Sequence, residues 1–171
     1  MKKVTILLTF IFSLAFIFPI YSNEKKNISN EHEFSFYTGM FDFSDDGQRA
    51  TLVGVQHQNE SLKRKSFLGT LSPITGFIIT ENNAQYFYTG IQAQYKIGKL
   101  NVVPSFTPGL YGKGDGKDLG HVVEFKSEVQ LSFDLFSDSE LGFSYNHISN
   151  ASLGKKNPGA NNYMFNFIKQ F

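Results

Sequence analysis

The stretch EFKSEVQLSFDLF, residues 124–136, decides the fold because its side chains alternate in polarity. Apolar side chains fall on odd positions and polar ones on even positions, namely Phe125, Val129, Leu131, Phe133 and Leu135 against Glu124, Lys126, Glu128, Gln130, Ser132 and Asp134. Successive side chains of a β-strand point to opposite faces of the sheet. The stretch therefore predicts a strand with one apolar face and one fully polar face.

The same alternation recurs along most of the chain. In YFYTGIQAQYKIG, residues 86–98, odd positions again carry the apolar side chains and even positions carry glutamine and lysine. Clusters of turn-forming residues separate such stretches, which predicts eight strands at about 33–43, 49–58, 66–80, 84–96, 100–112, 120–135, 139–150 and 160–171. After the apolar N-terminal segment, residues 1–22, the sequence shows no long helical periodicity, no repeat beyond this alternation and no second domain.

The polar faces of these strands decide between two kinds of barrel. A soluble barrel is apolar inside and polar outside, whereas an outer-membrane barrel presents apolar side chains to lipid and packs polar ones within. An apolar N-terminal run that reads as an export signal, short turns alternating with longer loops, and 19 phenylalanines favour the second kind. The predicted fold is all-β, an eight-stranded antiparallel transmembrane β-barrel of outer-membrane type, too narrow for a pore. A soluble periplasmic lipid-binding barrel is the alternative.

The two ends of the chain carry targeting information. Met1–Lys3 precedes an apolar run, Val4–Phe18, that is too short for a membrane span, so we expect residues 1–22 to be a signal peptide and residues 23–171 the barrel domain. The final strand ends at Phe171, which resembles the terminal signature of Gram-negative outer-membrane barrels. This resemblance implies location in the outer membrane of a Gram-negative bacterium, and the barrel-assembly machinery as a partner during biogenesis.

Composition excludes several classes of function. The formal charge is +1, and it falls to −1 when the leader takes Lys2 and Lys3 with it, so no basic field attracts nucleic acid. There is no cysteine, hence no disulfide, thiol nucleophile or thiolate metal site. The histidines are scattered singly, so we expect no metal and no cofactor.

A histidine and a serine stand close together in ELGFSYNHISN, residues 140–150. His147 and Ser149 share the odd, lipid-facing parity of Leu141, Phe143 and Tyr145. A spacing of two places both groups on one face, about 6 to 7 Å apart along the backbone, so the imidazole can take the hydroxyl proton. A strand end in the interfacial or aqueous zone, where both residues are harmless, is the plain alternative.

The longer string HISNAS, residues 147–152, followed by NPGANN and a final aromatic strand, resembles the lipid A 3-O-deacylase (PagL-like) family. The resemblance implies an eight-stranded outer-membrane barrel whose outer surface hydrolyses the ester-linked 3-O-acyl chain of lipid A in the outer leaflet. It implies His147 as the general base, Ser149 as the nucleophile and Asn150 in the oxyanion hole. The Asn150 and Ala151 backbone amides are the alternative donors, because strand parity points the Asn150 side chain inward.

The chain departs from the family at the acid. The best-known members have a glutamate twelve residues beyond the serine, and here that position is Asn161. Asn161 has lipid-facing parity and its amide oxygen can fix the tautomer of His147, although it cannot stabilise the imidazolium as a carboxylate does. Asp138 and Glu140 are other acids on the His147 strand, but at its far end.

Two lysines in the loop after the serine, Lys155 and Lys156, are candidates to bind a lipid A phosphate, with solvated loop lysines as the alternative. The leading hypothesis is thus a serine-dependent carboxylic ester hydrolase acting on lipopolysaccharide. The rival is a non-catalytic small outer-membrane barrel with a structural or adhesive role. The sequence leaves open which acyl chain is removed and whether two copies form a homodimer.

Overall fold

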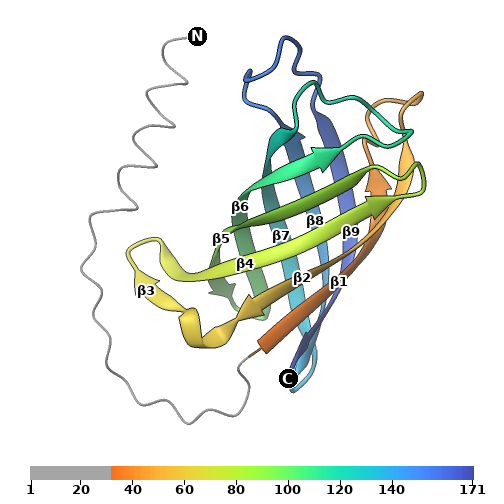
Figure 1. Ribbon diagram of the computed structural model, residues 1–171. Helices are drawn as coiled ribbons and strands as arrows, with labels where there is room; N and C mark the ends of the chain where they lie inside the picture. The colour runs from red at the N-terminus through yellow and green to blue at the C-terminus, as the bar shows by residue number, and fades with distance from the viewer. Residues whose placement is uncertain (1–31) are drawn as a thin grey trace.

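The structure is a computed structural model that describes residues 32–171 (Figure 1). The expected signal peptide, residues 1–22, lies outside this part. The described residues form nine strands and one short 3-10 helix: β1 His32–Phe41, β2 Ala50–Asn59, η1 Glu60–Leu62, β3 Arg64–Ser66, β4 Gly69–Thr80, β5 Gln85–Ile97, β6 Leu100–Gly112, β7 Val123–Phe136, β8 Ser139–Ser149 and β9 Ala160–Gln170. Within them no helix is long and apolar enough to cross a membrane.

Eight of the strands close into an antiparallel barrel. Each pairs with its neighbour in the chain, β1 pairs with β9, and β2 pairs with β4 across the short β3. The strand β3 pairs only with β4 and lies beside the barrel wall (Figure 1). The prediction of an eight-stranded antiparallel barrel is therefore confirmed.

The predicted strand boundaries needed two larger corrections. The single strand expected at 66–80 is split into β3 and β4, because the chain turns back at Gly69, whose φ of +93° is rarely adopted by other residues. The strand expected at 120–135 begins only at Val123. The remaining strands lie within two residues of their predicted positions, because their alternation was clear.

The barrel has the inverted polarity that the sequence predicts. On β7 the residues at even positions from Glu124 to Ser132 are buried, whereas Val129, Leu131 and Phe133 are 41–53% exposed on the outside. On β9, Phe165 and Phe167 likewise point outward, while Asn162 and Asn166 are buried inside. An apolar exterior around a polar interior suits a wall surrounded by lipid.

The interior is filled by two kinds of packing. A polar network occupies the middle, with a buried ion pair of 3.0 Å between Lys126 and Glu128 and the Lys126 ammonium 4.2 Å from the centre of the Tyr88 ring. Nearer the loops lies a hydrophobic cluster that includes Tyr86, Leu119 and Met164. This cluster was not predicted, because its members alternate with outward-facing apolar residues and so do not stand out in the sequence.

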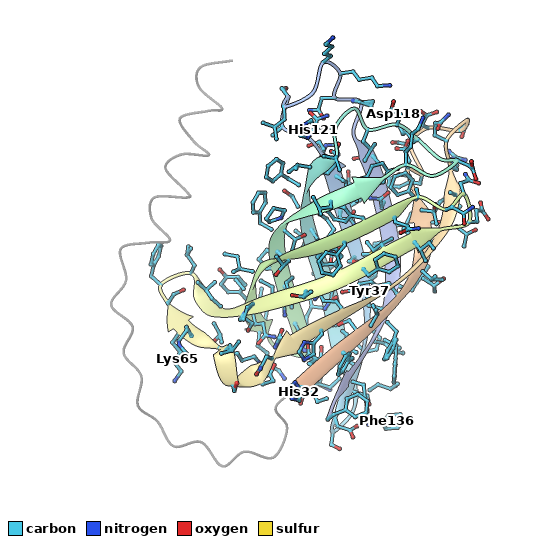
Figure 2. All side chains as sticks on the ribbon, viewed as in Figure 1. His32, Tyr37, Lys65, Asp118, His121 and Phe136 are labelled. Atoms are coloured by element: carbon cyan, nitrogen blue, oxygen red, sulfur yellow. The ribbon has the colours of Figure 1, made fainter. Side chains whose placement is uncertain are left out.

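The two ends of the barrel differ. The loops 42–49, 113–122 and 150–159 extend from one end, while the other carries the C-terminus and the two-residue turns 98–99 and 137–138 (Figure 1). In Figure 2, His121 and Asp118 lie at the loop end, and His32 and Phe136 lie at the opposite end. Outer-membrane barrels place long loops outside the cell and short turns in the periplasm, so we assign the loop end to the exterior.

Candidate active site

His147 and Ser149 are the last two outward positions of β8, at the loop end of the wall. Strand register places Ser127 of β7 and Asn161 of β9 on either side of His147, and Phe125 of β7 beside Ser149. Adjacent residues of one sheet face are close enough for their side chains to interact. The register therefore builds a polar patch into an otherwise apolar outer wall.

The imidazole of His147 is held by Asn161. The His147 Nδ1 lies 2.8 Å from the Asn161 Oδ1, as the parity of the two strands predicts. An amide oxygen only accepts, so this hydrogen bond places the proton on Nδ1 and leaves Nε2 as a free base. The geometry of the predicted base and its orienting residue is thus present.

Further hydrogen bonds hold the side chain and backbone of Asn161, including one of 2.9 Å from the Phe43 backbone N–H to the Asn161 carbonyl. The hydroxyl of Tyr145 donates to Asn161 Oδ1 at 2.9 Å, and Asn161 Nδ2 donates to Ser44 Oγ at 3.0 Å. The Asn161 backbone N–H also lies 3.3 Å from Asp42 Oδ1. Ser44 and Asp42 belong to the loop after β1, so this loop is part of the site.

Aromatic side chains lie beside the polar patch. The Phe43 ring lies 5.5 Å from Tyr163 and 6.2 Å from Tyr145, between centroids, and forms a cluster next to Asn161. Tyrosine and other aromatic residues gather where lipid headgroups meet acyl chains. The patch therefore has, beside it, aromatic residues of the kind found at that boundary.

Ser149 is half-buried beside His147. Among residues 32–171 its hydroxyl has no hydrogen-bond partner, so it makes no hydrogen bond to His147. Catalytic hydrogen bonds are often long before substrate binds and shorten in the complex. Both residues lie on the outward face of β8, two positions apart.

Gly159 lies against the other edge of the His147 ring. A Cβ at this position would stand 2.7 Å from His147 Cε1 and 3.1 Å from Nε2, and its φ is +63°. Both the conformation and the lack of space require glycine here. Gly159 thus leaves the basic edge of the imidazole free, a role for which the sequence gives no sign beyond the Pro158–Gly159 turn.

Asn150 organises the loop that follows the serine. Its side chain is fully buried, and its Nδ2 donates to Leu119 O at 2.8 Å and Lys156 O at 2.9 Å. Its backbone N–H donates to Asn157 Oδ1 at 3.0 Å. The inward direction predicted from parity is therefore correct, and all of these donors are engaged within the loops.

The Ala151 amide differs from those of Asn150. Within the described residues its N–H has no acceptor, and Ala151 and Ser152 have φ values of +51° and +67°. Consecutive left-handed residues other than glycine are unfavourable and are found where the surrounding structure enforces them. Of the two sequence-predicted oxyanion donors, Ala151 is the one with a free N–H.

The loop lysines are in different situations. Lys156 Nζ pairs with Asp118 Oδ2 at 2.9 Å, and this ammonium holds the pKa of the Asp118 carboxyl below its usual value. Lys155 is exposed and has no partner within the described residues. Both lie in the loop that carries Asn150, so either ammonium can face lipid headgroups.

The alternative acids do not approach the histidine. Glu140 accepts hydrogen bonds from Asn101 at 3.0 Å and Ser132 at 2.6 Å, and Asp138 pairs with Lys169, all at the opposite end of the barrel. In residues 32–171 no three His, Asp or Glu side chains are grouped as they are around a metal ion. Asn161 is thus the partner that the structure gives to His147.

Comparisons with known proteins agree with the resemblance seen in the sequence. The sequence matches the family model of lipid A 3-O-deacylase, PagL, over residues 22–169. A solved structure described as the outer membrane enzyme PagL is 15% identical, with 81% of this chain and 99% of that chain covered and a TM-score of 0.59. A structure from a study of de novo designed transmembrane β-barrels is 9% identical, with 85% and 100% covered and a TM-score of 0.55. No curated protein matches the sequence.

At such low identity the two solved structures support the barrel fold alone, whereas the family model spans most of the chain. The chain is an outer-membrane β-barrel and belongs to the PagL family of lipid A 3-O-deacylases.

Proposed function

We propose that this barrel is a serine esterase in which His147 activates Ser149 to hydrolyse the ester-linked 3-O-acyl chain of lipid A. The hydrogen bond of 2.8 Å between His147 Nδ1 and Asn161 Oδ1, on the outward wall at the loop end, carries the proposal. It orients a base two positions along β8 from Ser149, whose hydroxyl has no hydrogen-bond partner within residues 32–171. Family membership supplies the substrate class.

The reaction has two stages. His147 Nε2 takes the Ser149 proton while Oγ attacks the ester carbonyl, and the imidazolium then gives this proton to the departing sugar oxygen. Water, activated by the same nitrogen, attacks the acyl-enzyme and releases a fatty acid with regeneration of Ser149. The Ala151 N–H is the donor available to the oxyanion of each tetrahedral intermediate.

The outer wall presents the substrate. Acyl chains lie along apolar residues such as Phe143 and Phe165, which are 43% and 58% exposed. The aromatic cluster around Phe43 supports a position of the sugar ester at the height of His147. Lys155, which has no acidic partner within residues 32–171, is better placed than Lys156 to bind a phosphate of lipid A.

Two partner assignments remain predictions from the sequence. The aromatic C-terminal strand supports recognition by the barrel-assembly machinery, because β9 closes the barrel against β1 and ends one residue before Phe171. The homodimer has no observation in its favour.

A second candidate, a non-catalytic structural or adhesive barrel, is favoured by one observation, which is the amide at the acid position. Asn161 orients His147, and among residues 32–171 no carboxylate is hydrogen-bonded to the imidazole. Loss of that charge reduces catalysis in enzymes of this type without abolishing it. Activity therefore has to be measured directly.

The test is mass spectrometry of lipid A from bacteria that express the wild-type chain, Ser149→Ala or Ser127→Ala. Ser127 is the matched control, because it is an exposed serine on the same outer face and the cross-strand neighbour of His147. We expect the wild type and Ser127→Ala to remove one ester-linked chain and Ser149→Ala to remove none. Complete deacylation by Ser149→Ala, or none by the folded wild type, contradicts the proposal.

A further inference from the structure

We propose that Asp42 is a positioning residue that acts through Ser44 and Asn161 to fix the tautomer of His147. The catalytic consequence of this arrangement rests on the proposed function. The hydrogen bonds themselves do not, because they connect the end of β1 to β9 whatever the chain catalyses.

The chain of hydrogen bonds starts at a buried carboxylate. Asp42 is 1% exposed, and its Oδ2 accepts from the ammonium of Lys117, which itself is only 12% exposed. Its Oδ1 lies 3.4 Å from Ser44 Oγ and 3.3 Å from the Asn161 backbone N–H. A carboxylate paired with an ammonium only accepts, so the Ser44 hydroxyl must donate to it.

The direction of the hydrogen bond from Ser44 to Asp42 determines the orientation of the Asn161 amide. Because the Ser44 hydrogen is used toward Asp42, its oxygen is left as an acceptor, and it receives Asn161 Nδ2 at 3.0 Å. The nitrogen and oxygen of an amide cannot both face the same way. Asn161 therefore turns Oδ1 toward His147, where Tyr145 also donates to it.

The orientation of the Asn161 amide determines the tautomer of the His147 imidazole. His147 Nδ1 faces an oxygen that can only accept, so it must carry the ring proton, and Nε2 stays unprotonated. In a serine esterase this is the tautomer that can remove the hydroxyl proton. Asp42 thus acts on His147 through two intervening side chains, Ser44 and Asn161. It is a carboxylate in a protein that has an amide, Asn161, at the position of the family's acid.

The variant Asp42→Asn tests the donor-to-acceptor direction of these hydrogen bonds. Lys117 requires an oxygen, so the new amide turns its NH₂ toward Ser44, and the Asn161 backbone N–H loses its acceptor. The Ser44 hydroxyl must then donate to Asn161, which reverses the hydrogen bonds from Ser44 to His147. The backbone tolerates the change, because asparagine adopts the φ of +48° found at Asp42. Asp45→Asn is the matched control: Asp45 also lies near Lys117 Nζ, at 3.5 Å, but bonds neither Ser44 nor Asn161.

The direct readout is the nitrogen NMR spectrum of the full chain, labelled with ¹⁵N-histidine in detergent micelles, at a pH where His147 is neutral. A His147→Gln variant identifies its signals among the four histidines. We expect the proton on Nδ1 in the wild type and Asp45→Asn, and mainly on Nε2 in Asp42→Asn. The Ser44→Ala variant, changed at an exposed residue, should show a mixture, and Ser44→Thr should restore the wild-type spectrum.

Kinetics on purified lipid A form the second readout. We expect Asp42→Asn to lower kcat about thirtyfold with KM unchanged, equivalent to about 2 kcal/mol at 1.36 kcal/mol per tenfold change. Ser44→Ala should lose several-fold and Ser44→Thr should recover. A wild-type chain without esterase activity whose tautomer still changes in Asp42→Asn supports the positioning role and refutes the proposed function.

A different result would overturn the positioning role of Asp42 and leave the esterase activity in place. An active enzyme whose His147 tautomer is the same in the wild type, Asp42→Asn and Ser44→Ala overturns the positioning role and leaves the esterase standing. If Asp42→Asn fails to fold, as judged by heat-modifiable migration, the comparison of Ser44→Ala with Ser44→Thr decides the question.

Discussion

Replacing Gly159 by alanine should disable the site while the barrel stays folded. The new Cβ would lie 2.7 Å from His147 Cε1, whereas carbon atoms in ordinary contact are about 3.5 to 4.0 Å apart, so the ring must retreat by about 1 Å. A catalytic group misplaced by about 1 Å can lose about a hundredfold in rate. We expect kcat to fall by that factor.

The same change has a backbone cost that must be separated from the effect on the ring. An alanine at the Gly159 φ of +63° destabilises the fold by about 1 kcal/mol. Gly98 has the same φ, +63°, and a Cβ there meets no atom within 4 Å. Gly98→Ala therefore imposes the same strain at the opposite end of the barrel without touching the site.

The assay measures release of fatty acid from purified lipid A in mixed micelles, with heat-modifiable migration as the test of folding. We expect Gly98→Ala to be as active as the wild type and Gly159→Ala to be folded but about a hundredfold slower. Wild-type kcat in Gly159→Ala would refute the reasoning that the free edge of His147 is the catalytic base. Equal losses in both variants would assign the effect to strain instead.

Three further predictions concern Asn161, the two loop lysines and Phe171. Asn161→Ala should lower kcat by roughly ten- to a thousandfold, while Asn161→Glu should hold or raise it and add an acidic limb to its pH profile, and unchanged activity in the alanine variant would place the orienting group elsewhere. Lys155→Ala should raise KM more than Lys156→Ala, since Lys156 is already paired with Asp118, and equal KM values would exclude phosphate binding. Deleting Phe171 should reduce the amount of inserted barrel on membrane fractionation, and normal insertion would remove its role as an assembly signal.

The sequence predicted the barrel well because lipid imposes a two-residue period on every spanning strand. Alternation in residues 124–136 identified inside and outside positions on β7, and the register of β8 and β9 follows from the same parity. This is why the contact between His147 and Asn161 was predictable. The extra strand β3 was not, because its split from β4 depends on the turn at Gly69 rather than on polarity.

The rest of the site comes from contacts between distant parts of the chain. Asp42 and Ser44 lie 119 and 117 residues before Asn161, in a loop with no motif, and only barrel closure between β1 and β9 brings them together. The engagement of the Asn150 donors likewise depends on Leu119, 31 residues away. Parity predicts which way a side chain points, but not which loop residue it meets.

The central claim is that Ser149 is a nucleophile activated by His147 on the outer wall of the barrel. Its most direct test is tandem mass spectrometry of the purified protein after reaction with a fluorophosphonate, which forms a stable bond with an activated serine. We predict one adduct, on Ser149, that forms much more slowly in His147→Ala and is absent from Ser149→Ala. An adduct on Ser127 instead, or none on a barrel that still releases fatty acid from lipid A, would contradict the account.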